Sequence, residues 1–211
     1  MTPAAEAALS RLRSFYRSPL YLRWFTAIRL GHSGYDIVEG HLPRAGRILD
    51  LGCGYGHFSN FAALMSPERE VTGIELNVRK LRYADKDLPR VAFKQGSALE
   101  LAGGHYDGIV LLHVLHHLGS YSEQERLLRW CVENLAPEGR LLVLEVDDRP
   151  WWKFIVAHIV DHGLYPGDGI YFRNRAAYLG LFGRLGLDCD VVPMESGRPF
   201  PHILYVCRKK A

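Results

Sequence analysis

The order of apolar runs and helix-patterned stretches along the chain predicts an α/β domain. Runs typical of buried strands fall within residues 47–58, 70–76, 91–101, 106–118 and 120–148, and two closing strands are expected at 187–194 and 201–210. Helical spacing of apolar residues between them predicts helices, among them 59–65, 78–88 and 175–185. Such an alternation is typical of a mostly parallel sheet with helices on both faces.

Three helices are expected before the first strand. Residues 4–16 are rich in good helix formers, and Pro19 interrupts them. A second amphipathic helix is expected over residues 20–31, where Gly31 stops it, and a third over 35–41. We therefore expect residues 1–46 to form a helical cap and residues 47–211 the main domain, with a lid-like insertion at about 149–173.

The stretch RILDLGCGYGHF, from Arg47 to Phe58, is the most informative in the chain. Its apolar strand ends in Gly52, Gly54 and Gly56, and the start of a helix follows. Glycine allows a sharp turn with positive φ, and it lets a ligand approach the backbone with no Cβ in the way. A strand, glycine turn and helix in this order predict a nucleotide-sized ligand, the alternative being a tight turn without one.

Asp50-Leu-Gly-Cys-Gly-Tyr-Gly56 resembles motif I, D-x-G-x-G-x-G, of the class I S-adenosylmethionine-dependent methyltransferases. The resemblance implies a Rossmann-like seven-stranded, mostly parallel sheet with an antiparallel last strand, and S-adenosylmethionine as cofactor. The spacing of these glycines differs from the G-x-G-x-x-G of dinucleotide-binding folds. An acid at the strand end would repel a pyrophosphate and attract the methionine ammonium. The cofactor-binding residues implied here are Asp50, Gly52, Cys53, Gly54 and Gly56.

Glu75 stands at the end of the predicted strand 70–76, 23 residues after Gly52. An acid about 20 residues past the glycine turn can accept hydrogen bonds from both ribose hydroxyls. The alternative is a solvated surface glutamate. Its neighbour Leu76 is included among the predicted cofactor-binding residues.

The family usually carries an acid after its third strand to hold the adenine amino group. This chain has Gly96-Ser97-Ala98 instead. The resemblance implies that the Ser97 hydroxyl and the Ala98 backbone N–H take over this contact. Ser97 has an alternative role as a helix N-cap.

Three histidines follow the fourth strand. His113 sits at its end, where open α/β sheets present groups to ligands, and we include it in the cofactor site. The following HVLHHL sequence resembles the small-molecule branch of the family. His117, with His116 beside it, is a candidate general base, and pocket architecture is the alternative. No Asp, Glu or Cys completes a metal site nearby, so no metal is expected.

The segment 149–173 is expected to close the acceptor side. It carries two tryptophans and several glycines, and its aromatic content favours an apolar or aromatic acceptor, unless the tryptophans are core. The resemblance implies that the N-terminal helices also cover this cleft, with Arg23 and Trp24 among the candidates. The predicted acceptor-binding residues are Tyr16, Arg29, Trp151, Asp161, His162 and Tyr165.

Composition narrows the function classes. The 211 residues are 48% apolar with a formal net charge of +3, as in an ordinary globular protein, and no apolar run is long enough to span a membrane. Four scattered cysteines without C-x-x-C predict neither a zinc site nor a disulfide framework and favour a reducing compartment. The N-terminus lacks a signal-peptide pattern, so a cytoplasmic location is expected.

We expect methyl transfer to a small molecule, with O-methylation favoured. The Asn/Asp-Pro-Pro-Tyr/Phe motif of adenine and glutamine methylation is missing, as is the Pro-Cys of pyrimidine C5-methylation. An RNA methyltransferase is an alternative, but Arg208-Lys209-Lys210 is the one basic run and nucleic acid is not an expected partner. A non-catalytic partner protein is a further alternative, against which stands the intact glycine turn.

Overall fold

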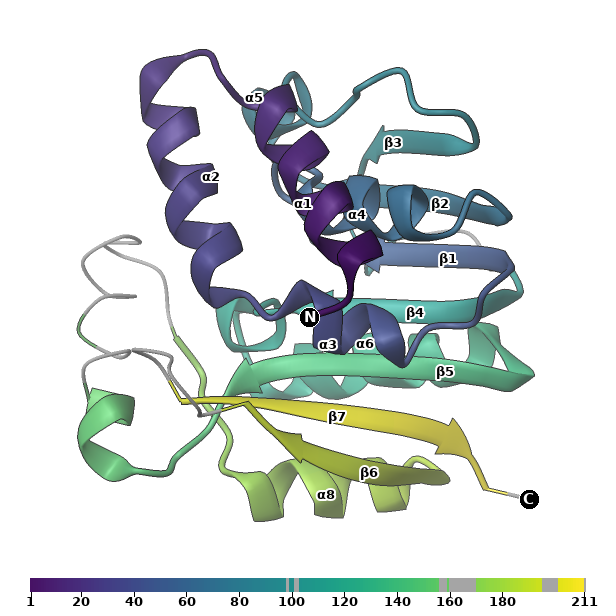
Figure 1. Cartoon of the computed structure of the whole chain (residues 1–211). Helices are drawn as coiled ribbons and strands as arrows, with labels where there is room; N and C mark the ends of the chain where they lie inside the picture. Colours follow the sequence, from purple (N-terminus) through teal and green to yellow (C-terminus); the bar gives the residue numbers. More distant parts are fainter. Residues whose placement is uncertain (98, 101–102, 156–158, 160–169, 195–200, 211) are drawn as a thin grey trace.

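A seven-stranded sheet with helices on both faces forms the molecule (Figure 1). The computed structural model describes residues 1–97, 99–100, 103–155, 159, 170–194 and 201–210. The strands are β1 (Gly46–Leu51), β2 (Arg69–Glu75), β3 (Val91–Gln95), β4 (Tyr106–Leu112), β5 (Leu135–Val146), β6 (Leu187–Pro193) and β7 (His202–Lys209). The helices are α1 (Pro3–Phe15), α2 (Leu20–His32), α3 (Tyr35–Gly40), α4 (His57–Met65), α5 (Val78–Leu81), a 3-10 turn η1 (Leu115–His117), α6 (Tyr121–Asn134) and α8 (Arg175–Arg184).

The strand order is β3-β2-β1-β4-β5-β7-β6, and β7 runs antiparallel to both of its neighbours, β5 and β6, whereas the other pairings are parallel. The predicted fold is therefore confirmed, including the antiparallel last strand. The order reverses between β1 and β4, which lie side by side in parallel. Ligands of open α/β sheets bind at the carboxyl ends of the strands beside such a reversal. The glycine turn after β1 and the histidines after β4 both lie at this point.

Alternate residues of the central strands supply two cores. Ile48 of β1 and Val110 of β4 pack beneath α1, α2, α3 and α4, whereas Leu49 and Ile109 pack against α6 and α8. This two-residue period follows from strand geometry, which points successive side chains to opposite faces. The N-terminal helices thus share one hydrophobic core with the sheet.

A buried ion pair fixes α3 to the sheet. Arg69, 1% exposed, places Nη2 2.8 Å from Glu39 Oε1 and donates Nε and Nη1 to backbone carbonyls of Pro43 and Ala62. Each of the three guanidinium nitrogens therefore lies within 3 Å of an oxygen. Burial of the charge is tolerated because these contacts replace its hydration.

Two predicted helix boundaries are wrong. The helix expected over 78–88 ends at Leu81, and Asp85 forms a local turn by accepting a hydrogen bond from the Asp87 N–H at 3.0 Å. Asp and Asn side chains compete with helical hydrogen bonds in this way. The second helix does not stop at Gly31 but continues to His32, and the chain turns at Gly34, whose φ is 62°.

Leu135–Gly139 forms the first part of β5, with a register shift against β4 between Tyr106 and Gly108. A bulge of this kind lets a strand bend without ending.

Cys189 and Cys207 form a disulfide, so the expectation of no disulfide is wrong for this pair. The two residues are 18 positions apart in sequence, but β6 and β7 pair so that they lie directly opposite each other, with Cα atoms 4.0 Å apart. Strand register decides this proximity, and cysteine spacing alone does not reveal it. Cys53 and Cys131 are free thiols.

Candidate cofactor and acceptor site

The three glycines after β1 all have positive φ, at 71°, 58° and 73°, but their surroundings differ. A Cβ on Gly52 would lie 2.6 Å from Val114, and one on Gly56 would lie 2.8 Å from Phe93. A Cβ on Gly54 would meet no atom closer than Glu75 Oε2, at 4.0 Å. Gly52 and Gly56 are therefore required by packing, whereas Gly54 faces space that a ligand can fill.

Glu75, at the end of β2, bridges the glycine loop and the start of α5. Its Oε2 accepts a hydrogen bond from Gly54 N–H and its Oε1 one from Asn77 N–H, both at 2.9 Å. Asn77 in turn caps α5 by accepting from Arg79 N–H. A carboxylate has about four acceptor positions, so two remain for hydroxyl donors. Glu75 is half-buried rather than solvated at the surface.

Asp50 is 2% exposed and its Oδ2 accepts a hydrogen bond from the Ser59 hydroxyl at 2.6 Å. Burial raises the pKa of Asp50 to about 7, against the lowering effect of the Ser59 hydrogen bond. The charge of Glu75 adds to the rise and that of Arg29 opposes it. Asp50 therefore ties β1 to α4, and a nearby cation would favour its ionised form.

The structure describes part of the region predicted to contact adenine. Leu76 follows Glu75 with 66% of its surface exposed, so its apolar side chain is available to a flat ring. The Ser97 hydroxyl accepts a hydrogen bond from Leu99 N–H at 3.1 Å, a local turn that short hydroxyl side chains favour. Ala98 lies outside the described residues.

His113 occupies the carboxyl end of β4 in a left-handed conformation, with φ at 59°. The backbone N–H of His113 donates to Leu144 O of β5. The centroid of the His113 ring lies 4.6 Å from that of the His202 ring on β7. Burial lowers the pKa of His113 well below its usual value, and the charges of His202 and Arg29 act in the same direction. The imidazole is therefore neutral near pH 7, at the end of the sheet where β4 meets β1.

His116 and His117 differ in exposure. His116 is 1% exposed, its Nδ1 bonds to Glu145 Oε2, and Phe172 stacks on its ring at 4.9 Å. Glu145 also accepts from Leu115 N–H at 2.9 Å, so its carboxylate fixes η1. His117 is half-buried with its ring 4.1 Å from that of His116. This geometry gives His116 an architectural position and leaves His117 as the more accessible of the two.

The predicted acceptor residues separate into three groups. Arg29, half-buried on α2, lies within electrostatic reach of Asp50 and His113 and donates to Tyr35 Oη at 3.4 Å. Tyr16 is 0% exposed and packs inside the fold. Trp151 is 70% exposed and Trp152 53% exposed on a helical segment at 151–155, so the tryptophans of this segment are not core. The remaining three, Asp161, His162 and Tyr165, lie outside the described residues.

A family model described as a methyltransferase domain matches residues 29–191. This range contains the glycine turn, Glu75 and the histidines after β4. The chain belongs to this methyltransferase family. The prediction of a class I S-adenosylmethionine-dependent methyltransferase from the glycine motif is thereby confirmed.

The methyltransferase is similar to several curated and solved proteins. It is 33% identical over 184 residues to a cobalt-precorrin-6B C(15)-methyltransferase of Salmonella typhimurium, covering 80% of this chain and 82% of that protein. It is 32% identical over 123 residues to a putative methyltransferase of Bacillus subtilis, covering 54% and 49%. The crystal structure of a Burkholderia thailandensis 1,6-didemethyltoxoflavin-N1-methyltransferase superimposes with a TM-score of 0.70 at 18% identity, over 100% of this chain and 92% of that one. This chain spans 28% and 49% of the length of two of the curated relatives that it matches.

Sequence reasoning missed several residues that shape this methyltransferase site. His57 follows the glycine motif directly, and its Nε2 lies 2.8 Å from Thr26 Oγ1, which joins the glycine loop to α2. Burial, with the charges of Arg29 and Lys86, lowers the pKa of His57 to about 3. Glu145 was also missed, although a carboxylate inside an apolar strand is a signal that could have found it. Among the described residues, no helix is both long and apolar enough to cross a bilayer.

Proposed function

We propose that this methyltransferase transfers a methyl group to a small apolar or aromatic acceptor, with a hydroxyl as the favoured methylated group. The observation that supports it is the joint position of Gly54 and Glu75. Gly54 exposes its backbone to open space, since a Cβ built on it would have no atom closer than 4.0 Å. Glu75 places a carboxylate beside that backbone. Both stand at the carboxyl ends of adjacent parallel strands.

The residues present fit S-adenosylmethionine. Glu75 would accept from the ribose hydroxyls with its two remaining acceptor positions, Leu76 would cover one face of adenine, and Asp50 would favour the methionine ammonium. When bound, the cofactor supplies a methyl group already activated by a positive sulfur. The chain therefore has to orient the acceptor in line with that methyl and exclude water.

The acceptor side is proposed to lie at the end of β4. His113 is neutral and lines the end of the sheet next to His202, and Arg29 brings a positive charge over the same region. His117 would take the proton from an acceptor hydroxyl, since a base is needed only where the acceptor must lose a proton near neutral pH. His116, held by Glu145, would keep η1 and therefore His117 in place.

A panel assay tests the acceptor class. Phenols, carboxylates, amines and bulk transfer RNA would each be incubated with cofactor carrying a labelled methyl group, and product would be separated and counted. Transfer to phenols is expected to exceed transfer to the other classes. Labelling of RNA alone would support an RNA methyltransferase. Tight binding of the demethylated cofactor without transfer to any panel member at several pH values would contradict a hydroxyl acceptor of this class.

A further inference from the structure

Helix α2 is apolar on two opposite faces. Leu22, Thr26 and Leu30 recur every four residues and are buried at 0%, 2% and 7% exposure. Leu20, Trp24 and Ile28 recur at the same interval on the other side and are 64%, 65% and 62% exposed, with Tyr21 beside them at 56%. A surface helix normally carries polar residues on its outer face. The outer face of α2 therefore has the composition of a second contact surface.

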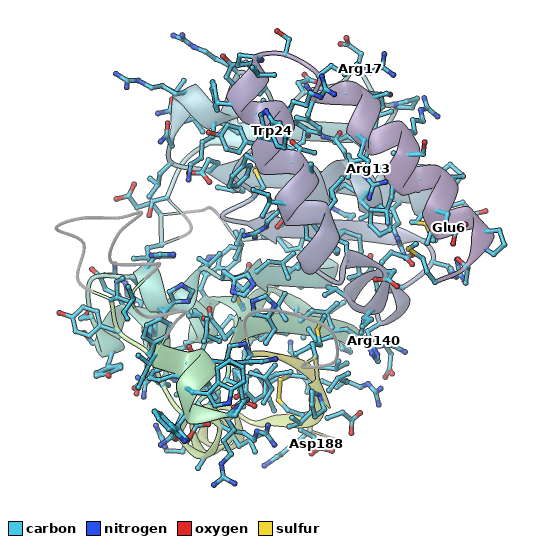
Figure 2. All side chains as sticks on the ribbon, turned by 60° about the vertical axis from the view of Figure 1, so that its left-hand side comes forward. Glu6, Arg13, Arg17, Trp24, Arg140 and Asp188 are labelled. Atoms are coloured by element: carbon cyan, nitrogen blue, oxygen red, sulfur yellow. A yellow bond between two sulfur atoms is a disulfide. The ribbon has the colours of Figure 1, made fainter. Side chains whose placement is uncertain are left out.

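Unpaired positive charges adjoin this outer face. A groove of about 520 Å³ between α1 and α2 is lined by Arg13, Arg17 and Arg23, together with serine and threonine hydroxyls. Within the described part of the chain, none of these three arginines has an acidic partner in ion-pair range. Residues 1–32 contain five arginines and one acidic residue, Glu6. Figure 2 shows Trp24 on α2 and Arg13 on the neighbouring helix α1, with Arg17 just after that helix.

A second exposed apolar cluster follows β5. Trp151, Trp152 and Ile155 are 70%, 53% and 46% exposed, and Lys153 lies 5.5 Å from the Trp152 ring. In Figure 1 this helical segment and α2 lie on the same side of the molecule, the side to which the carboxyl ends of the parallel strands point. Two apolar clusters with basic neighbours thus border the proposed site.

We propose that α1 and α2 dock this face onto an anionic lipid bilayer. Tryptophan and tyrosine prefer the boundary between lipid chains and headgroups, and an apolar helix face edged by arginine lies in that boundary. Trp24, Ile28 and Leu20 would enter the boundary, and the arginines of the groove would contact lipid phosphates. The choice of a bilayer rests on this charge complementarity, since the apolar stripe and the three unpaired arginines lie together. If the proposed function holds, an acceptor dissolved in the lipid would meet the acceptor side directly.

Vesicle sedimentation tests the docking. The full chain would be mixed with vesicles of phosphatidylcholine alone or with one-fifth phosphatidylglycerol, at low and high salt. Each basic residue near such a surface contributes about 1 kcal/mol, or about fivefold in binding. Arg13→Gln with Arg17→Gln should therefore weaken binding to anionic vesicles about thirtyfold. The matched control is Arg126→Gln with Arg129→Gln on α6, on the other face of the sheet, with the same change in net charge and little expected change in binding.

The apolar stripe is tested by Leu20→Ser with Ile28→Ser, which should reduce vesicle binding at least tenfold. Leu179→Ser, at an exposed leucine of α8, is its control. Thermal unfolding and binding of the demethylated cofactor, measured without vesicles, should stay unchanged in all four variants, which separates this proposal from the proposed function. Equal loss in the α6 control, or no preference for anionic vesicles in the parent chain, would overturn it. So would a dimer in light scattering that the Leu20 and Ile28 changes dissociate, because the stripe would then be a protein interface.

Discussion

Glu75 Oε2 accepts a hydrogen bond from the backbone N–H of Gly54 at 2.9 Å. One carboxylate thus supports the glycine loop and keeps acceptor positions for the proposed ribose contact, so the two motifs recognised in the sequence act as one unit. The loop is held by a group from the next strand, and the proposed cofactor contact and the loop conformation depend on each other.

Replacing Glu75 by Ala is expected to weaken binding of the demethylated cofactor by tenfold or more. A hydrogen bond to a charged group contributes about 1.5–3 kcal/mol, and the loop loses its support as well. Titration calorimetry measures the change. Glu70→Ala, an exposed glutamate on the same strand, is the matched control and should bind normally. Unchanged affinity in the Glu75 variant would refute the ribose assignment.

Gly54→Val and Gly56→Ala should fail in different ways. A side chain at Gly54 enters open space, so the variant should fold, with a cost of about 1–2 kcal/mol for its positive φ, but lose cofactor affinity at least tenfold. A Cβ at Gly56 meets Phe93 and Ala84 within 3 Å, so that variant should lose stability first. Chemical denaturation and calorimetry together separate the two. Normal cofactor binding by folded Gly54→Val would contradict a close backbone approach.

His117→Ala distinguishes a base from a pocket wall. With an acceptor found in the panel, loss of a general base should lower kcat about 10²- to 10⁴-fold and leave cofactor affinity unchanged. A histidine that only shapes the pocket would instead raise KM with kcat little changed. Steady-state kinetics give both values. Unaltered kcat and KM would remove His117 from the acceptor site.

His116→Ala should act on stability. His116 is 1% exposed and bonds to Glu145, also 1% exposed, so truncation leaves a buried carboxylate without this partner. Leaving a buried acceptor without its hydrogen-bond partner costs about 1–3 kcal/mol, and more when the acceptor is charged. Urea unfolding at pH 7 measures the loss, and His105→Ala, an exposed histidine, is the control. If the His116→Ala variant were as stable as the wild type, the His116–Glu145 pair would not be what fixes η1.

Asp50→Asn is expected to change how stability depends on pH. Burial raises the pKa of Asp50 from 3.8 to about 7, so between about pH 4 and pH 7 the folded chain holds a proton that the unfolded chain has released. The contribution of Asp50 to stability therefore falls as pH rises through this window, by up to about 1.4 kcal/mol per unit.

The readout is the stability difference between wild type and Asp50→Asn in urea, from pH 4.5 to 7.5. His57, with a pKa lowered to about 3, acts in the opposite direction over part of this range but is common to both proteins. The wild type should lose stability relative to the variant as pH rises. Asp188→Asn, an exposed carboxylate, should show no such trend, and a pH-independent difference for Asp50→Asn would contradict its protonation.

Local patterns predicted the strands and the glycine turn because these depend on neighbours in sequence. The buried run 48–51 ends in glycines, and both features follow from backbone geometry alone. The helix after Asn77 was overextended because Asp85 and Asp87 form a turn that helix propensity does not register. The Cys189–Cys207 disulfide and the Glu145–His116 pair depend on strand register and on contacts between elements distant in sequence.

The acceptor side was harder to predict for a related reason. Tyr16 and Trp24 were chosen because the resemblance implies that the N-terminal helices cover the cleft, yet one side chain turned inward and the other outward. Helical phase relative to the core decides such orientations, and α2, apolar on both faces, gives an ambiguous phase. His57 and Thr26 show the converse, since two polar residues form a contact between helices that neither local sequence reveals.

The Asn60 amide nitrogen lies within hydrogen-bonding distance of three oxygens: Tyr16 Oη at 3.0 Å, Gly56 O at 2.8 Å and Ala84 O at 2.8 Å. Helix α1, the glycine turn and the chain after α5 thus meet at one side chain. Transplanting residues 1–46 into a relative, to exchange acceptor preference between enzymes, therefore requires the recipient to carry asparagine at the position of Asn60. A chimera without this asparagine would leave the Tyr16 hydroxyl without the amide that hydrogen-bonds to it. It would also loosen the glycine turn that the transplanted helix was meant to cover.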